Sequence, residues 1–275
     1  MTKEKPVRLD KFVSDRKMAA SRAAARNYIE EGRVSVNGVV VTKPASMVRP
    51  DADVKIDAPE KEWVSRGAYK LLKAMESFAV DARGRRCVDI GASTGGFTEV
   101  LLERGAAHVY SVDVGYGQLA WKLRGDERVT ALERTNARNL TIEMIEGEKA
   151  DIIVSDASFI SAKLLLPKME ELLKDDGAIV LLVKPQFEAG HERVGKGVVT
   201  DPALHIAILN ELADFIEQRT ALSLEAADYS PIRGPEGNIE FLFFLKRRVN
   251  FSLKERPDFD KMVAEAHIKS RAHPK

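Results

Sequence analysis

Cysteine is nearly absent from this 275-residue chain: Cys87 is its only cysteine, so no internal disulfide can form. Zinc sites built on thiolates need at least two cysteines at close spacing, which excludes that class of site. The scarcity of cysteine suits a reducing cytoplasm, where we expect the protein to act. The histidines are dispersed, without the spacing of metal ligands, and no metal site is predicted. They are His108, His191, His205, His267 and His273.

Long hydrophobic runs are missing as well. The longest apolar run near the middle, Ala178–Val183, has six residues, whereas a helix needs about 20 to cross a bilayer. The first residues, Met1 to Lys5, lack the apolar stretch of a signal peptide. We therefore expect no membrane span and no membrane partner. Hydrophobic residues still make up 44% of the chain, enough for a buried core.

The chain as a whole lacks an excess of either charge, since its formal net charge is +1. Its parts differ: residues 1–49 carry a net charge of +6 and residues 246–275 a net charge of +5, which leaves −10 on residues 50–245. Two basic ends around an acidic middle favour a polyanionic partner such as nucleic acid. An ordinary solvated surface is the alternative interpretation.

Residues 1–58 are predicted to form a small α+β domain. Ser21 is placed to cap a helix that stops at Gly32. Asn37-Gly38 lies between two alternating apolar segments, which is a strong signal for a hairpin turn. The expected elements are a helix over 8–13, a helix over 22–31, a hairpin over 33–41 and a strand over 53–56.

Basic residues gather on the helices of this domain and before its hairpin: Arg8, Lys11, Arg16, Lys17, Arg22, Arg26 and Arg33. A basic helix followed by the pattern G-R-V-x-V-N-G resembles the alpha-L RNA-binding module. That module occurs in a small-subunit ribosomal protein, tyrosyl-tRNA synthetases and pseudouridine synthases. The resemblance covers about residues 6–58 and implies that these residues bind structured RNA through its phosphates. A-form RNA exposes phosphates and hides its major groove, which agrees with this prediction.

After a linker predicted over residues 59–65, strands and helices alternate through residues 66–250, and a basic tail follows over 251–275. Alternation of this kind predicts a Rossmann-like α/β sheet, mostly parallel and covered on both faces. The tail from Phe251 has three interpretations, namely a helix, a further RNA contact or a disordered end. Strands are expected over 86–90, 108–112, 129–132, 151–155, 178–183, 222–230 and 239–246, and helices over 66–78, 97–104, 164–174 and 202–218. The last two strands follow each other directly, so they are expected to pair in an antiparallel manner at one edge.

A glycine-rich turn, Gly91–Gly96, follows the first strand of this domain and precedes a helix. Ligands of open α/β sheets bind beyond the carboxyl ends of the strands, where such a turn lets the backbone approach them closely. The turn departs from the G-x-G-x-x-G fingerprint of dinucleotide sites. It resembles motif I of S-adenosylmethionine-dependent methyltransferases.

Asp113 ends the second strand, where its carboxylate can accept hydrogen bonds from ribose hydroxyls, and Asn136 follows the third strand, near the expected adenine. A helix cap and a turn residue are the alternatives for these two. The resemblance implies S-adenosylmethionine as the cofactor. The predicted cofactor-binding residues are Asp89, Gly91, Ala92, Ser93, Gly95, Gly96, Phe97, Asp113, Asn136 and Asp156.

Four ionisable residues occupy positions that the strands and the first helix would bring together: Lys70, Asp156, Lys184 and Glu240. Lys184 follows six apolar residues, so it lies at the mouth of a buried strand and needs a carboxylate partner. Asp156, at the end of the adjacent strand, is the natural partner. A structural ion pair would explain any one of these residues, but not all four around a glycine turn.

This order of Lys, Asp, Lys and Glu resembles the tetrad of the FtsJ-like 2′-O-ribose methyltransferases. With an alpha-L module in front, the chain resembles the TlyA (hemolysin A) family. The stretches 154–161, 183–188 and 195–199 carry the resemblance further. It implies 2′-O-methylation of cytidine in ribosomal RNA, with ribosomal RNA or ribosomal subunits as partners and the four residues as the catalytic set. Family members differ in whether they modify the large-subunit RNA alone or both subunits.

Our mechanistic hypothesis is that Lys184, when neutral, accepts the proton of the ribose hydroxyl or orients its lone pair, while the two carboxylates hold the lysines in place. Alignment of the hydroxyl and the methyl group supplies much of the rate. Three other functions remain as alternatives: a non-catalytic RNA-binding assembly factor, a nicotinamide-dependent oxidoreductase and a cytolysin.

Overall fold

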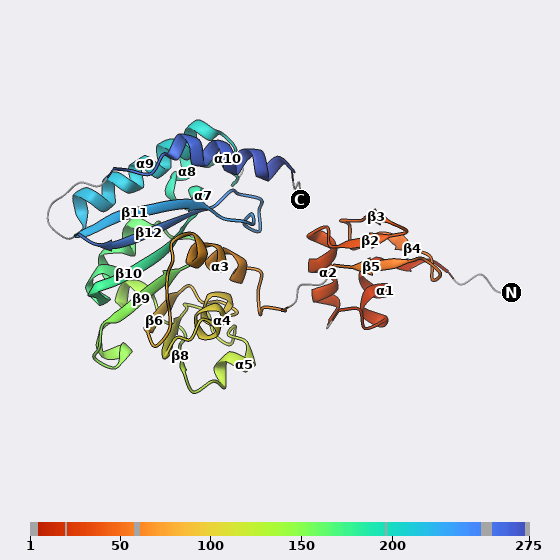
Figure 1. Cartoon of the computed structure of the whole chain (residues 1–275), viewed down its shortest axis with the longest axis horizontal. Coiled ribbons are helices and arrows are strands. Elements are labelled where there is room, and N and C mark those ends of the chain that lie inside the picture. Colours follow the sequence, from red (N-terminus) through yellow and green to blue (C-terminus); the bar gives the residue numbers. More distant parts are fainter. Residues whose placement is uncertain (1–4, 20, 58–60, 196, 249–254, 273–275) are drawn as a thin grey trace. The chain divides into compact units, whose positions relative to one another are not determined.

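The computed structural model describes the whole chain except residues 1–4, 20, 58–60, 196, 249–254 and 273–275. It divides into an N-terminal unit that ends at Glu62 and a larger unit over Trp63–Ala272 (Figure 1). The fold class predicted above is confirmed, because a small α+β unit precedes an α/β unit with a central, mostly parallel sheet.

The N-terminal unit packs two helices against short strands. Ser21 caps the second helix as predicted, since its hydroxyl accepts a hydrogen bond from Ala24 N at 3.1 Å. Asn37 and Gly38 have positive φ values of 51° and 81°, as the predicted tight hairpin requires. The elements are β1 (Val7–Arg8), α1 (Leu9–Asp15), α2 (Arg22–Glu30), β2 (Val34–Val36), β3 (Val39–Val40), β4 (Met47–Val48) and β5 (Val54–Ile56).

Buried apolar residues from both helices and the sheet, among them Leu9, Phe12, Ile29 and Val34, give this unit a core of its own. Its sheet has the order β3-β2-β5, and β1 pairs separately with β4. The two-residue pair β1–β4 was not predicted, because segments this short leave no periodic pattern in the sequence.

The larger unit is built on a seven-stranded sheet of order β11-β12-β10-β9-β6-β7-β8. Five neighbouring strands, β8, β7, β6, β9 and β10, run parallel to one another. β12 pairs in an antiparallel manner with both β10 and β11. The predicted antiparallel pair at one edge is therefore confirmed. The strands are β6 (Arg86–Ile90), β7 (His108–Val112), β8 (Val129–Leu132), β9 (Ala150–Ser155), β10 (Leu173–Val183), β11 (Leu222–Tyr229) and β12 (Phe241–Arg247).

Helices cover both faces of this sheet (Figure 1). Along β10, Ile179, Leu181 and Val183 face one apolar core, whereas Val180 and Leu182 face the other, which is the two-residue period of a strand buried on both sides. The helices are α3 (Ala68–Ser77), α4 (Gly96–Glu103), α5 (Trp121–Arg124), α6 (Leu166–Leu172), α7 (Pro185–Glu188), α8 (His191–Val194), α9 (Pro202–Arg219) and α10 (Phe259–Ala272), with 3₁₀ turns η1 (Ala137–Asn139), η2 (Glu143–Ile145) and η3 (Ala162–Leu164).

The register of the strands places the ends of several strands at one edge of the sheet. Ile90, the last residue of β6, pairs with Val112 and Ser155, the last residues of β7 and β9. At the same edge, Val183 at the end of β10 pairs with Phe241 at the start of β12. The residues that follow β6, β7, β9 and β10, and those that precede β12, therefore lie near one another.

Several elements of the larger unit differ from the prediction. The helix expected over 164–174 ends at Leu172, and β10 begins at Leu173 rather than at residue 178. Leu173 pairs with Ala150, and a register shift then separates this pair from the regular pairing that starts at Ala178. The four-residue helix α5 was not predicted, because it is shorter than the window that reveals helical periodicity.

The C-terminal segment, for which the sequence left three interpretations, contains the helix α10. Phe259 and Val263 of α10 are buried in the same core as α9 and β11, and the rings of Phe259 and Phe243 stack with their centroids 5.7 Å apart. Arg256 pairs with both Asp214 and Glu217 of α9 at 2.6 Å. This helix is therefore part of the larger unit rather than a separate tail.

Trp63, in the predicted linker, is half-buried and packs with Val64 against the core beneath α3 and α4. Within the described part of the chain, no helix is both long and apolar enough to cross a membrane.

Candidate active site

The glycine-rich turn between β6 and α4 forms one wall of the site. Gly91 has a φ of +82°, and a Cβ atom there would fall 2.8 Å from Ala157 Cα, so only glycine fits. Gly95, at the N-terminus of α4, also has a positive φ of +97°. The predicted residues Ala92 and Phe97 are largely buried and, like Gly96 at the start of α4, line the smaller of the two cavities described below.

Asp113, directly after β7, faces the same turn. Its carboxylate accepts hydrogen bonds from Ser93 N at 2.8 Å and from Gly115 N at 2.7 Å, which fixes its orientation. Asn136 caps η1, because its side-chain oxygen accepts a hydrogen bond from Arg138 N at 3.1 Å. Both residues line one cavity of about 810 Å³. Asn136 therefore acts as a turn residue, which was the alternative interpretation, and also lines the cavity.

Asp89 and Gly95 differ from the other predicted cofactor-binding residues, because they line neither cavity of the site. Asp89 lies within β6, ahead of the turn. Its carboxyl group is fully buried, and Thr98 Oγ1 donates a hydrogen bond to it at 2.7 Å. Burial raises the pKa of Asp89 to about 7. Its side chain thus joins β6 to the first turns of α4 on either side of the glycine-rich turn.

The buried carboxyl group of Asp89 predicts a pH effect on stability. Between about pH 4 and pH 7 the folded protein holds a proton that the unfolded chain has already released, so stability falls as pH rises through this window. The shift from 3.8 to about 7 corresponds to on the order of 4 kcal/mol. Urea unfolding at pH 5 and pH 8 is expected to show that the stability gained by Asp89→Asn over the wild type is larger at pH 8 than at pH 5. Parallel pH profiles for the two proteins would contradict the assignment.

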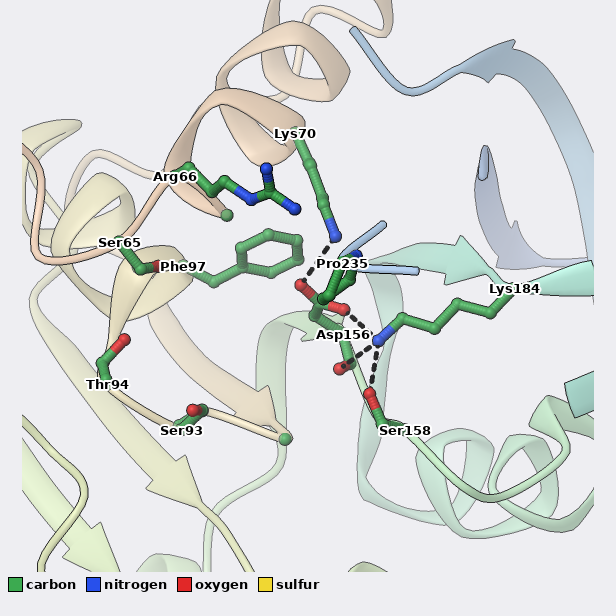
Figure 2. Close-up of a pocket in the computed structure, with 14 residues that line it drawn as sticks. Ser65, Arg66, Lys70, Ser93, Thr94, Phe97, Asp156, Ser158, Lys184 and Pro235 are labelled. Atoms are coloured by element: carbon green, nitrogen blue, oxygen red, sulfur yellow. Dashed lines mark hydrogen bonds and ion pairs between the residues drawn. The ribbon is translucent and has the colours of Figure 1, made fainter. Parts of the chain in front are cut away.

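Two cavities meet at the carboxyl edge of the sheet. The larger combines apolar walls, such as Val112, Ile160 and Leu165, with a few polar groups, as nucleoside sites do. The smaller, of about 230 Å³, lies between the start of α3, the glycine-rich turn and Lys184 (Figure 2). Four residues line both cavities, namely Gly91, Ser93, Asp156 and Ser158.

The four predicted catalytic residues lie together beside this junction. Asp156 Oδ1 is 2.6 Å from Lys184 Nζ, and its Oδ2 is 3.4 Å from Lys70 Nζ (Figure 2). Lys70 Nζ is also 2.7 Å from Glu240 Oε2. Lys184, Asp156, Lys70 and Glu240 thus form one chain of ion pairs that links the end of β10, the end of β9, α3 and the start of β12.

The four side chains of this ion-pair network are largely buried. The side chains of Lys70, Lys184 and Glu240 are 6%, 8% and 1% exposed, whereas that of Asp156 is 20% exposed. Burial raises the pKa of Glu240, and the charge of Lys70 opposes the rise. Buried charges of this kind persist only when they are paired, and two cations facing two carboxylates leave no net charge.

Two residues that the sequence analysis did not select hold this site in place. Ser158 Oγ lies 2.7 Å from Lys184 Nζ as a hydrogen-bond partner. Glu188 accepts hydrogen bonds from Ser161 Oγ and Ala162 N, both at 2.7 Å, and so ties the loop after β9 to α7. Glu188 follows Lys184 by about one helical turn, but this spacing is too common in sequences to single it out.

The basic residues predicted to bind RNA all lie in the N-terminal unit, where Arg33 is half-buried and the others are exposed. Arg8 and Arg22 both pair with the buried carboxylate of Asp10, at 2.9 Å and 3.1 Å. The hydrogen bond from Arg8 is the main cause that lowers the pKa of Asp10 to about 2. These two arginines therefore hold the unit together as well as adding charge to its surface.

The remaining basic residues of this set differ in how far their charge is neutralised. Arg26 and Arg33 pair with glutamates, at 3.9 Å and 2.9 Å, and Arg16 donates a hydrogen bond to Pro50 O at 2.6 Å. Lys11 and Lys17 are exposed and pair with no carboxylate in the part of the chain that the structure describes. Within the predicted set of seven, they are thus the cations that are freest to meet an anionic partner.

Two family profiles match the chain. FtsJ-like methyltransferase matches residues 63–247, and the S4 domain matches residues 7–54. Among the described residues, no group of three or more His, Cys, Asp or Glu side chains is arranged to hold a metal ion.

Similar proteins cover almost the whole chain. The 16S/23S rRNA (cytidine-2'-O)-methyltransferase TlyA of Mycobacterium tuberculosis H37Rv is 46% identical over 90% of this chain and 93% of its own length. Hemolysin A of Brachyspira hyodysenteriae is 40% identical over 86% of this chain and 98% of its own. A solved structure of a hemolysin-named protein from Streptococcus thermophilus covers 98% of both chains at 35% identity, with a TM-score of 0.76.

Proposed function

The chain belongs to the TlyA family of FtsJ-like methyltransferases, and from this membership we propose that it methylates the 2′-hydroxyl of cytidine in ribosomal RNA. The observation that carries the proposal is the buried chain Lys184–Asp156–Lys70–Glu240 at the junction of two cavities. The relative from M. tuberculosis is named for both 16S and 23S RNA, so both ribosomal subunits are proposed as substrates. The cytoplasm, where ribosomes are found, is the proposed compartment.

The larger cavity fits S-adenosylmethionine, the proposed methyl donor. Asp113 is oriented to accept hydrogen bonds from the ribose hydroxyls, Asn136 lies where the adenine edge is expected, and Gly91 lets the donor approach the backbone. When bound, S-adenosylmethionine supplies a methyl group on a positively charged sulfur, which the 2′-oxygen displaces. Asp156 and Ser158 line both cavities, so they stand between donor and acceptor.

Lys184 is the proposed proton acceptor. Its Nζ contacts Asp156 Oδ1, Asp156 O and Ser158 Oγ at 2.6, 3.1 and 2.7 Å, three contacts that fix its position. A serine hydroxyl donates as readily as it accepts, so the contact with Ser158 persists when the amine is neutral. The neutral amine takes the hydroxyl proton as the oxygen attacks. Lys70 pairs with both Asp156 and Glu240 and so holds Asp156 in place.

The N-terminal unit is proposed to bind the phosphates of ribosomal RNA, chiefly through its free lysines. Lys11→Ala combined with Lys17→Ala is expected to weaken binding to ribosomal subunits at low salt. It is also expected to reduce the slope of log affinity against log salt by about one to two, because each lysine that meets a phosphate releases counterions. The double variant keeps the Arg8–Asp10–Arg22 cluster, so the fold of the unit is preserved. An unchanged slope would mean that these lysines meet no phosphate.

A methyl-transfer assay tests the proposed function directly. Labelled S-adenosylmethionine is incubated with the protein and either ribosomal subunits or naked ribosomal RNA from cells that lack this modification. The expected result is label in a nuclease-resistant 2′-O-methylcytidine. Cofactor binding by calorimetry without any RNA methylation would instead favour a non-catalytic assembly factor. Absence of both would refute the methyltransferase function, and lysis of lipid vesicles by the pure protein would indicate a cytolysin.

A further inference from the structure

The chemistry of RNA places a requirement on the smaller cavity, if the proposed function holds. The 2′-hydroxyl of an internal ribose sits on the carbon next to the one that bears the 3′-phosphodiester. A site that brings this hydroxyl to Lys184 must therefore also accept the adjacent phosphate anion. A phosphate brought close to a partly closed surface needs a cation or several hydrogen-bond donors there.

The lysines of the site are not free to meet this anion. Lys184 Nζ is 2.6 Å from Asp156 Oδ1, and Lys70 Nζ is 2.7 Å from Glu240 Oε2. Two carboxylates already neutralise the two lysines, and both amines are nearly closed to solvent. The cation for the phosphate has to come from elsewhere in the cavity wall.

Arg66 meets this need. It lies just before α3, one helical turn ahead of Lys70, and it lines the smaller cavity with an exposed side chain. Figure 2 shows its guanidinium group beside Lys70 and Phe97. In the described ranges no carboxylate forms an ion pair with Arg66. The planar guanidinium fork also matches the geometry of phosphate oxygens better than an ammonium does.

The surroundings of Arg66 hold it at the cavity rather than neutralising it. Its Nη2 donates a long hydrogen bond of 3.4 Å to the carbonyl oxygen of Arg233, in the loop between β11 and β12. Arg233 is itself anchored, because its Nη2 donates a 2.6 Å hydrogen bond to Ser270 O near the end of α10. Pro235, two residues further along the same loop, also lines the cavity.

We propose that Arg66 binds the phosphodiester on the 3′ side of the target ribose and so positions the 2′-hydroxyl at Lys184. This makes Arg66 a substrate-positioning residue that acts on RNA and not on the methyl donor. The proposal rests on the proposed function and adds to it a second RNA contact, inside the catalytic unit.

Three variants test the proposal in the full-length protein: Arg66→Ala, Arg66→Lys and, as a control, Arg83→Ala. Arg83 is 81% exposed and lines neither cavity. Methyl transfer to unmodified ribosomal subunits is measured over a range of salt concentrations, and cofactor affinity is measured by calorimetry. For Arg66→Ala we expect kcat/KM to fall by about 10- to 100-fold and the salt slope of kcat/KM to drop by about one. Arg66→Lys is expected to restore the slope and part of the rate, with cofactor affinity unchanged in all three.

The outcomes separate this proposal from the proposed function. If the wild type methylates RNA and Arg66→Ala keeps its rate and its salt slope, the phosphate contact is refuted while the function stands. A lower rate with an unchanged slope, not rescued by Arg66→Lys, would show that Arg66 only supports the Arg233 loop, and this also overturns the proposal. If the wild type transfers no methyl group to any RNA, the proposed function itself fails, and the phosphate contact fails with it.

Discussion

Lys184→Ala is expected to reduce methyl transfer at least about 1,000-fold, because removal of a positioned proton acceptor costs about 10²- to 10⁴-fold and the fixed contacts of Lys184 are lost as well. Cofactor affinity should stay within about a factor of two. Lys184 lines the smaller cavity and is absent from the wall of the larger one, where the nucleoside is proposed to bind. The rate is best measured in a single turnover with enzyme in excess, so that RNA release does not mask the chemical step.

A control for this variant separates proton transfer from charge. Lys184→Arg keeps a cation beside Asp156 but supplies no neutral amine, because arginine stays protonated. If Lys184 accepts the proton, the arginine variant should be nearly as inactive as the alanine variant while folding normally. Substantial transfer by Lys184→Arg would show that the residue acts as a fixed charge, and wild-type transfer by Lys184→Ala would remove it from the mechanism.

Phe259→Ala is expected to lower the free energy of unfolding of the larger unit by about 3 kcal/mol or more, the usual cost of removing a buried phenyl ring. Phe259 is 3% exposed and stacks on Phe243 of β12, the strand that follows Glu240. The loss therefore weakens the contact of α10 with the part of the sheet that carries the site. Urea unfolding followed by circular dichroism measures the change.

The matched control for Phe259→Ala lies on the same helix. Ile268 of α10 is 68% exposed, so Ile268→Ala should change the free energy of unfolding by less than about 0.5 kcal/mol. The pair compares a buried and an exposed apolar residue on one element. Equal unfolding midpoints for the two variants would mean that α10 does not pack against the sheet in solution.

The candidate site was largely predictable because it depends on strand ends. Apolar runs mark where β6, β9 and β10 stop, and in a parallel sheet those ends meet at one edge. Asp156 and Lys184 were placed by this rule alone. Glu240 was predicted inside a strand over 239–246, whereas it precedes β12, and the antiparallel pairing of β12 with β10 brings it to the same edge. The predicted roles of these residues remain predictions that the variants above test.

What could not be predicted depends on contacts between distant segments. No local pattern shows that Asp10 holds Arg8 and Arg22, because the contact with Arg22 joins two helices. The buried contact of Asp89 was missed for the same reason, since its partner Thr98 belongs to α4. The helix α10 is weakly amphipathic in sequence, and its packing follows from the apolar side chains of α9 and β11 that it contacts.

The position of β12 between β10 and β11 has a consequence for the order in which the activity appears during protein synthesis. The N-terminal unit is complete when Glu62 has been made, and domains fold as units from the N-terminus. The ion pair of Lys70 with Glu240 can form only after β12 has entered the sheet beside β10. A nascent chain therefore acquires its S4 unit early and the proposed catalytic charge network last. We expect a chain released before residue 240 to bind the ribosome without modifying it.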